Sequence, residues 1–346
     1  MLSDPALPRR SWRRAWPAMA LLILMLSGLA GCARQPASPP APFPPEQVSA
    51  PDVRPPGGRL LAVMVENHRA ARPQSGLDRA DVVFEALVEG GITRFLAIYS
   101  RDDAPVIGPV RSARPYFVSL AQPFDPIYVH CGESNSGIRA IQDAGVADLD
   151  QMLYAGAFWR DHRRRKPHNL YTSTERLWRY AERLAYQRSP VRLPFTVESV
   201  PPAGEPALGV DIGYHYGERY EVRWRYDPSS GFYRRFINGA PHTDAVTGRQ
   251  LVANTIYLLQ TPTQLRLATT GELEVQVLGT GNAWLLRDGR LVRGTWSRTD
   301  DFAPFDLFAE DGSPMAAKPG PIWVQIIPST RQPRFALRQV SSRGSR

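Results

Sequence analysis

Residues 82–100 read VVFEALVEGGITRFLAIYS, two runs rich in β-branched and aromatic residues on either side of Gly90-Gly91. A glycine pair between such runs indicates a β-hairpin with a two-residue turn. In that register Glu89 faces Ile92, Leu87 faces Arg94 and Glu85 faces Leu96. A four-residue loop keeps the same register, whereas a three-residue loop breaks it.

Strand alternation then assigns the hairpin side chains to two faces. Glu85, Glu89 and Arg94 share one face, with Arg94 diagonal to both carboxylates. Four residues at about 3.3 Å place the two Glu Cα atoms roughly 13 Å apart, beyond the ~5–9.5 Å carboxyl spacing of glycosidases. We therefore favour a structural or ligand-orienting network over catalysis by Glu85 and Glu89. The opposite, core face is expected to hold Phe84, Ala86, Val88, Phe95 and Ala97.

The segments around the hairpin predict a first body of mixed strands and helices. Strand patterns cover Leu60–Val65 and Ile127–His130, and helix patterns cover 112–121, 135–144 and 173–186. The last helix begins after a capping box, Thr172-Ser-Thr-Glu175. This mixture predicts an N-terminal α/β domain over residues 59–198.

The rest of the chain predicts a second body that consists of strands. A stretch rich in Pro and Gly, 198–209, separates the two bodies, and residues 331–346 form a basic tail that we expect to be frayed. The fold class is therefore α+β, with an antiparallel β-rich domain at 207–330. Its strand patterns are Tyr220–Tyr226, Thr255–Leu259, Leu273–Leu278, Ala283–Arg287, Leu291–Trp296 and Ile322–Ile327.

The N-terminus has the pattern of a lipoprotein signal peptide. Four arginines precede an apolar run from Ala15 to Ala30, which is shorter than the about 20 residues of a membrane span. The run ends in Leu29-Ala-Gly-Cys32, which resembles a bacterial lipobox. We expect residues 1–31 to be removed, Cys32 to be acylated, and Pro-rich residues 32–58 to form a tether. The alternative is an ordinary signal peptide with a chance cysteine.

Export and composition exclude several function classes. A protein outside the cytoplasm meets little ATP or NAD, which disfavours kinases and dehydrogenases. The formal charge is +9, but only two of the 42 basic residues are lysines, so the arginine excess is weak evidence for phosphate binding. We expect no cofactor and no nucleic-acid partner. We also expect no metal, because His242 and Asp244 are too few ligands and no zinc motif is present.

Arg111-Ser-Ala-Arg114-Pro115 is a candidate anion site. Ser112 is expected to cap a helix with Pro115 in its first turn. Two arginines at a helix start oppose the helix dipole, so they indicate an anionic ligand. The alternative is that an arginine pairs with a structural acid such as Glu85 or Glu66.

A second candidate is the loop 161–169. Its run of four cations, Arg163 to Lys166, is expected to be solvated, whereas His168-Asn169 lies next to a helix start. His168 is therefore a candidate ligand-binding or acid–base residue. Cys131 is expected to be a small buried residue, and Ser134 is a weak candidate nucleophile.

Several motifs together resemble the DUF3048 (YerB-like lipoprotein) family, and they cover nearly the whole chain after Cys32. The resemblance implies an extracytoplasmic lipoprotein with two domains, and it implies no known reaction. The motifs are Val65-Glu-Asn67, Ala71-Arg-Pro-Gln-Ser-Gly-Leu77, Ala80-Asp-Val-Val-Phe-Glu85, Gly91-Ile-Thr-Arg-Phe95, Gly108-Pro-Val-Arg-Ser-Ala-Arg114, His168-Asn-Leu-Tyr-Thr172, Gly281-Asn-Ala-Trp284, Asp288-Gly289, Gly294-Thr-Trp296 and Trp323-Val-Gln-Ile326.

The sequence therefore favours a non-catalytic, membrane-anchored protein that binds an anionic envelope ligand, a cell-wall polymer or another envelope protein. Its candidate binding residues are Arg94, Arg111, Arg114, His168 and Asn169. In a Gram-negative host, Ala33 after Cys32 favours the outer membrane. The first alternative is an envelope hydrolase that gathers Glu85, Arg111, Arg114 and His168 in one cleft. The second is a structural tether without a polar pocket.

Overall fold

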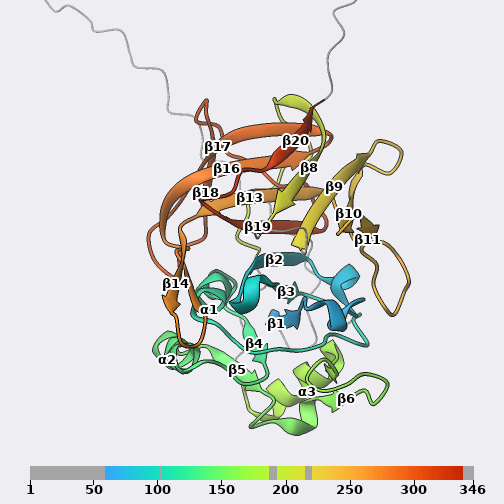
Figure 1. Ribbon diagram of the computed structural model, residues 1–346, viewed down its shortest axis with the longest axis vertical. Helices are drawn as coiled ribbons and strands as arrows, with labels where there is room; N and C mark the ends of the chain where they lie inside the picture. The colour runs from blue at the N-terminus through green and yellow to red at the C-terminus, as the bar shows by residue number, and fades with distance from the viewer. Residues whose placement is uncertain (1–58, 102, 187–192, 215–219, 338–346) are drawn as a thin grey trace, which may run out of the picture. The chain divides into compact units, whose positions relative to one another are not determined.

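The computed structural model describes residues 59–101, 103–186, 193–214 and 220–337 (Figure 1). Cys32, the signal peptide and the tether lie outside the described residues, as do His215 and residues 338–346 of the basic tail. Within these ranges, no helix has the length and apolar character that a membrane crossing requires.

Strands dominate the described part of the chain, and 16 of them form one sheet. The order along its main path is β11-β10-β9-β8-β17-β16-β13-β19-β2-β3-β1-β4-β5, while β12, β18 and β20 pair at its side with β10, β17 and β8. Its strands are β1 (Leu61–Glu66), β2 (Val82–Leu87), β3 (Thr93–Tyr99), β4 (Ile127–His130), β5 (Ala147–Asp150), β8 (Glu205–Gly213), β9 (Glu221–Asp227), β10 (Phe232–Ile237), β11 (Ala240–Pro241), β12 (Val252–Ala253), β13 (Thr255–Thr261), β16 (Gly279–Arg287), β17 (Arg290–Arg298), β18 (Asp306–Ala309), β19 (Ile322–Pro328) and β20 (Arg334–Leu337). Two small ribbons pair β6 (Trp159–Arg160) with β7 (Leu170–Tyr171), and β14 (Thr263–Leu267) with β15 (Glu272–Val275).

The sheet is continuous across the predicted boundary between the two bodies. Strand β19 lies between β13 and β2 and is parallel to both, with Gln325 opposite Glu85 (Figure 1). We expected an antiparallel second body, and the parallel pairs of β19 show that this expectation was wrong in part. Parallel neighbours need a crossover of a dozen or more residues, and residues 262–321 provide it between β13 and β19.

Several strands lie where the sequence predicted none, among them β5, β10 and β18. Strand β8 begins at Glu205, inside the stretch assigned to the linker, and β20 lies inside the tail that we expected to be frayed. The last two strands pair with each other, and β8 also pairs with β9 and β17. Neither segment carries a strong strand pattern of its own.

Three α-helices occur in the described ranges, all before residue 184: α1 (Pro115–Ala121), α2 (Asn135–Ala144) and α3 (Thr174–Arg183). The bounds of α2 confirm the prediction. Helix α1 begins two residues later than expected, with Arg114 rather than Ser112 at its N-cap. Helix α3 is capped by Ser173, whose side chain accepts a hydrogen bond from the Arg176 N–H, so the predicted capping box was wrong by one residue.

The hairpin register differs from the predicted one. Val88 donates a backbone hydrogen bond to Ile92 at 2.8 Å, which leaves Glu89-Gly90-Gly91 as a three-residue loop. Both glycines have positive φ, 74° and 68°, a conformation that glycine adopts without steric cost. This loop shifts the pairing by one residue, so that Glu85 faces Phe95. The predicted faces were therefore wrong: Glu85 and Arg94 lie on opposite faces of the hairpin.

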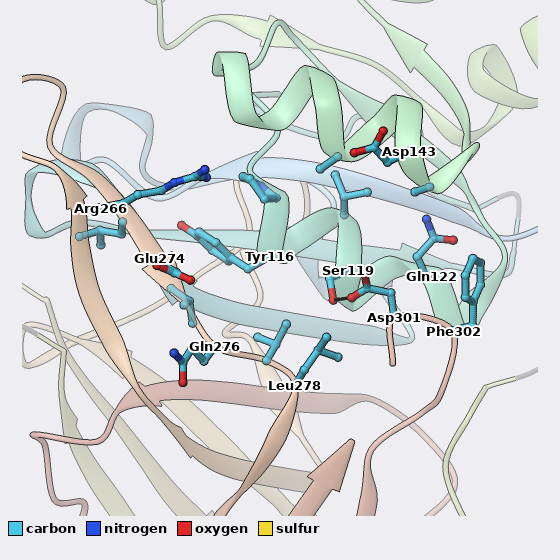
Figure 2. A pocket seen from close by; sticks show the side chains of 17 residues that line it. Tyr116, Ser119, Gln122, Asp143, Arg266, Glu274, Gln276, Leu278, Asp301 and Phe302 are labelled. Atoms are coloured by element: carbon cyan, nitrogen blue, oxygen red, sulfur yellow. Dashed lines mark hydrogen bonds between the residues drawn. The ribbon is translucent and has the colours of Figure 1, made fainter. Parts of the chain in front are cut away.

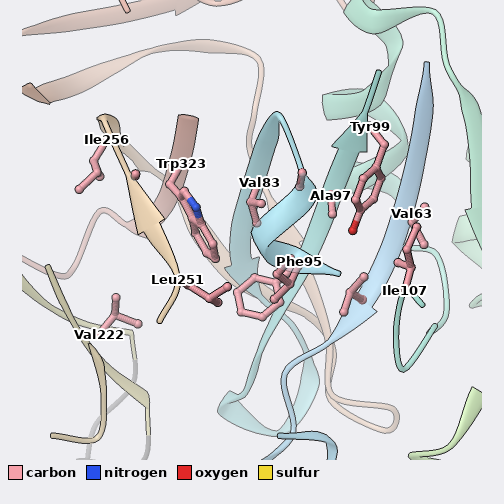
Figure 3. Close-up of a cluster of buried hydrophobic side chains, with 14 of the residues drawn as sticks. Val63, Val83, Phe95, Ala97, Tyr99, Ile107, Val222, Leu251, Ile256 and Trp323 are labelled. Carbon is pink, nitrogen blue, oxygen red and sulfur yellow. The ribbon is translucent and has the colours of Figure 1, made fainter. Parts of the chain in front are cut away.

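Both faces of the central strands are buried, and each faces its own apolar cluster. The first cluster includes Phe95, Ala97 and Trp323, and Figure 3 shows how side chains from both bodies meet in it. The second cluster covers the other face with Phe84 and Leu96. Every residue of β2 and β3 is buried, so no face of this hairpin meets solvent.

Candidate functional site

The carboxyl ends of three parallel strands meet at one edge of the sheet. Strand β1 is parallel to β4, and β4 is parallel to β5, with His130 opposite Asp150. Residues 110–113 cross between the ends of β1 and β4: the Arg111 N–H donates to Met64 at 3.0 Å, and its carbonyl accepts from Cys131 at 3.1 Å. We call this region, with Glu66, Arg111, Cys131, Glu133, Asp148, Asp150 and His130, the carboxyl edge. Ligands of open α/β sheets bind at such an edge.

Two predicted binding residues converge here on one carboxylate. Glu66 is only 2% exposed; its Oε1 lies 3.2 Å from Arg111 Nε, and its Oε2 lies 2.9 Å from His168 Nδ1. The His168 ring stacks on His68, with centroids 4.7 Å apart and planes 9° apart. The pairing of an arginine with Glu66 was the structural alternative in the sequence analysis, and it holds for Arg111.

Asn169 shapes the loop that carries His168. Its Nδ2 donates to the carbonyls of Asp161 and Arg164, and its Oδ1 accepts from Arg160 at 3.0 Å. Because Asn169 is buried, any effect of this residue on a ligand acts through Arg160. Arg163 is 89% exposed and pairs only with Asp161 among the described residues, as expected for a solvated loop. Arg164 departs from that expectation, because it is half-buried and donates to the Pro73 carbonyl at 2.7 Å.

Cys131 lies between the positive and negative groups of the edge. It is half-buried rather than buried, and its thiol donates to Gln151 Oε1 at 3.3 Å. Burial raises the pKa of the Cys131 thiol, and the guanidinium groups of Arg160 and Arg111 act against that shift. The thiol is therefore not an activated nucleophile.

Glu85 belongs to a buried network that joins the two bodies. Its Oε1 accepts from Thr93 at 2.7 Å and its Oε2 accepts from Arg235 at 2.8 Å, and both Glu85 and Arg235 are 0% exposed. Arg235 Nε donates to His242 Nδ1 at 3.0 Å, and His242 Nε2 lies 2.7 Å from Gln74 Oε1. Burial, followed by the nearby Arg235, holds the pKa of His242 well below its usual range. A carboxylate enclosed in this way has a structural role, not a catalytic one.

Arg94 and Arg114, two further candidates, are also satisfied within the protein. Arg114 forms a bidentate ion pair with Glu89, Nε to Oε1 at 2.6 Å and Nη2 to Oε2 at 2.8 Å. Buried Arg94 donates to the Ser112 carbonyl at 2.6 Å; burial, followed by Arg114, lowers its pKa to about 10. Helix α1 has seven residues and its N-cap arginine is paired, so the anion site expected at its start is not present.

The hydrolase alternative required four residues in one cleft, and the structure separates them. Glu85 pairs with Arg235, Arg114 pairs with Glu89, and Arg111 and His168 share Glu66. The two remaining candidates, Arg111 and His168, lie at the carboxyl edge, which also holds a group of acidic side chains around His130 that was not predicted from the sequence.

Glu133, Asp148 and Asp150 surround His130, which is almost completely buried. Its Nε2 lies 3.2 Å from Asp148, while its Nδ1 lies 3.1 Å from the Gly132 carbonyl, 3.5 Å from Glu133 and 3.8 Å from Asp150. The spacing of His130 and Glu133 after a strand was a readable signal. The two aspartates join them only because β5 pairs with β4. His242 and Asp244, the pair considered from the sequence, make separate contacts: Asp244 accepts from the Val246 N–H at 2.8 Å.

Two family models match the chain. Residues 49–187 match the N-terminal domain of DUF3048, a family of proteins of unknown function, and residues 210–324 match its C-terminal domain. The chain belongs to the DUF3048 family. The resemblance stated from the sequence motifs is therefore confirmed.

A relative and a solved structure agree with this membership in the DUF3048 family. The chain is 35% identical over 276 residues to a Bacillus subtilis (strain 168) protein named "Putative lipoprotein YerB", which covers 78% of this chain and 81% of the relative. The crystal structure of YerB from Bacillus subtilis matches with a TM-score of 0.72 and 31% identity, over 80% of this chain and 93% of that chain.

This DUF3048 chain also has a groove away from the predicted residues. It has a volume of about 590 Å³ and lies between α1, α2, the β14–β15 ribbon and the turn at 301–302. Figure 2 shows Tyr116 and Ser119 on one side and Glu274 and Gln276 on the other. Its lining is Pro115, Tyr116, Val118, Ser119, Gln122, Ala140, Asp143, Ala144, Arg266, Leu273, Glu274, Val275, Gln276, Val277, Leu278, Asp301 and Phe302, which includes none of the predicted site residues.

Proposed function

We propose that this DUF3048 protein is a lipid-anchored, extracytoplasmic protein that binds a carboxylate- or phosphate-bearing polymer of the cell envelope at the carboxyl edge. One observation carries the proposal. Arg111 is partly exposed, its Nε forms no hydrogen bond within the described residues, and the carboxylate near it, Glu66, is shared with His168. A guanidinium with an unused donor suits a carboxylate or phosphate ligand.

The charge balance of Arg111 and Arg160 supports an external partner. Glu66 is the only carboxylate in ion-pair distance of Arg111 among the described residues, and Arg111 shares it with His168. Arg160 bonds to the neutral Asn169 and forms no ion pair within the described ranges. The Arg111 side chain is 29% exposed, so a ligand can reach it from solvent.

Binding is preferred to hydrolysis because the edge offers no activated nucleophile beside the arginines. The Cys131 thiol has a raised pKa, and the carboxylate of Glu66 is enclosed by Arg111 and His168. Glu85 and Glu89, the acids considered for catalysis, are already paired with Arg235 and Arg114. The site therefore supports recognition of an anion rather than its cleavage.

We expect Arg111→Gln to weaken co-sedimentation of the full chain with purified sacculi about tenfold, the effect of one charge-assisted hydrogen bond. The melting temperature should fall moderately, because buried Glu66 loses one of its two cationic partners but keeps His168. Added salt should weaken wild-type binding more than that of the variant.

Arg179→Gln is the matched control, since Arg179 is an exposed arginine of α3 that pairs with Glu175. It should leave co-sedimentation unchanged. An unchanged affinity for Arg111→Gln, or a large fall in its melting temperature, would show that Arg111 serves only the fold.

The membrane anchor is tested at Cys32. The lipobox pattern of the sequence supports lipidation, and so does the name of the Bacillus subtilis relative, which calls it a lipoprotein. Cys32→Ser should move the protein from the membrane fraction to the soluble extracytoplasmic fraction. Retention of the variant in membranes at the wild-type level would disprove the anchor and leave the binding proposal to stand on the sacculus experiment.

A further inference from the structure

The acidic end of the carboxyl edge has a geometry that the proposed function does not use. His130, Glu133 and Asp150 each offer one ligand atom, and these three atoms lie within 4.8 Å of one another. Nδ1 of His130 is 3.5 Å from Glu133 Oε2 and 3.8 Å from Asp150 Oδ1. Ligand atoms about 2.1 Å from a tetrahedral zinc ion lie about 3.4 Å apart. The observed separations are close to this value.

One ligand atom in this group, Glu133 Oε2, is buried and forms no hydrogen bond with the described residues. Its ion-pair contact there is His130 Nδ1, at 3.5 Å. Buried carboxylate oxygens are almost always hydrogen-bonded, so such an atom calls for an unseen partner. Since Oε2 faces His130 Nδ1 and lies near Asp150, that partner belongs between the three side chains.

The other ring nitrogen of His130 is held as metal-binding histidines usually are. Nε2 lies 3.2 Å from Asp148 Oδ2, so it donates to a carboxylate. In metal sites this second contact fixes the ring and leaves the opposite nitrogen for the ion. Nδ1 donates to the Gly132 carbonyl at 3.1 Å, and a bound ion would take the place of that proton. Asp150 Oδ1 accepts from the backbone N–H groups of Gly132 and Met152, which fix its position.

The charges of the group favour a cation. Three carboxylates surround one imidazole, and within the described ranges no lysine or arginine forms an ion pair with Glu133, Asp148 or Asp150. A divalent ion would offset the repulsion between these carboxylates.

We propose that His130 Nδ1, Glu133 Oε2 and Asp150 Oδ1 bind a divalent transition-metal cation, with Asp148 as a positioning residue. One imidazole with two carboxylates is a ligand set that suits zinc. Three protein ligands leave a coordination position for water or an anion. The inference stands on these four side chains and does not depend on the proposed function.

The experiment measures Zn²⁺ binding by calorimetry to the full chain, purified without a histidine tag and treated with EDTA. We expect one Zn²⁺ per chain, together with a rise in melting temperature. Glu133→Gln should weaken Zn²⁺ binding at least tenfold while its melting temperature in EDTA stays at the wild-type value. Glu133 is suited to this test because its side chain is 18% exposed and its Oε2 forms no hydrogen bond with the described residues.

His68→Gln is the matched control, because the stacked His68–His168 pair is another place where zinc can bind. It should leave the Zn²⁺ affinity unchanged. Asp148→Asn should weaken binding about 10- to 100-fold and should change the visible spectrum of the Co²⁺-loaded protein, an effect that a purely structural role does not produce.

Three results would overturn the proposal. The first is no Zn²⁺ binding to the EDTA-treated wild type, which would leave His130 as a buried imidazolium between carboxylates. The second is equal affinity for the wild type and Glu133→Gln. The third is loss of binding in His68→Gln, which would place the ion on the stacked histidines.

Discussion

Replacing Arg235 with methionine is expected to lower the free energy of unfolding by about 3–5 kcal/mol, because it leaves the Glu85 carboxylate buried without its cation. Glu85 and Arg235 are 150 residues apart in sequence and are both fully buried. Thr93 and Asn67 still donate to Glu85 in the variant, but neutral hydrogen bonds do not replace an ion pair.

The surroundings of Arg235 add to the loss. Its guanidinium packs over the rings of Trp323, Trp224 and Phe95, with 4.5 Å from the central carbon to the centroid of Trp323. Methionine keeps the apolar contacts with these rings but not the cation–π attraction. His242 also loses the donor to its Nδ1.

Urea unfolding of the full chain measures the effect, and Arg234→Met is the matched control. Arg234 is the neighbour on the same strand, pairs with Asp227 and is 44% exposed, so its loss should cost less than about 1 kcal/mol. The double variant Glu85→Gln/Arg235→Met should recover part of the loss, because it removes the stranded charge. Similar losses of unfolding free energy for Arg235→Met and Arg234→Met would show that the buried Glu85–Arg235 pair contributes little to stability.

Local sequence patterns located most of the regular elements. Alternation and capping placed β4 at Ile127–His130 and α2 at Asn135–Ala144, because these signals depend only on residues close in sequence. The hairpin was located correctly too. Its register was not, because two glycines are compatible with both a two-residue and a three-residue loop.

Pairings between distant segments could not be read from the sequence. Nothing in Ile322–Pro328 shows that this strand lies beside Val82–Leu87. Nor does any local pattern show that Arg235 covers the face of Glu85 that we expected to be exposed. The burial of Glu85 changes its role from a candidate acid to half of a structural ion pair. A carboxylate's function thus depended on a contact with Arg235, which no local pattern indicates.

Only part of the candidate site was predicted, because local patterns select single residues but do not show which residues the fold brings together. Arg111 and His168 were selected from their local context, and the fold brings both to Glu66. Arg114 was selected by the same argument, but it is paired with Glu89, a residue of the hairpin loop. The group around His130 was missed because Asp148 and Asp150 lie about a strand and a helix away in sequence.

Phe95→Asp is expected to destabilise the protein by more than about 4 kcal/mol, since it buries a carboxylate in the apolar cluster. Phe95 is fully buried and packs edge-on against Trp323, with centroids 5.6 Å apart. In the observed register it also faces Glu85, so the new carboxylate would compete with Glu85 for Arg235. Phe95→Ala, which introduces no charge, should cost about 3–5 kcal/mol and remain folded enough to measure.

A second substitution tests the register itself. Glu85→Gln in the Phe95→Asp background should recover stability, because the carboxylate introduced on β3 then supplies the one negative charge that Arg235 needs and the like-charge contact is gone. In the two-residue-turn register, positions 85 and 95 lie on opposite faces and the two changes would simply add. Urea unfolding of the two single variants and the double variant decides between these cases. Additive losses would mean that Glu85 and Phe95 do not share a face, and the three-residue loop would then be wrong.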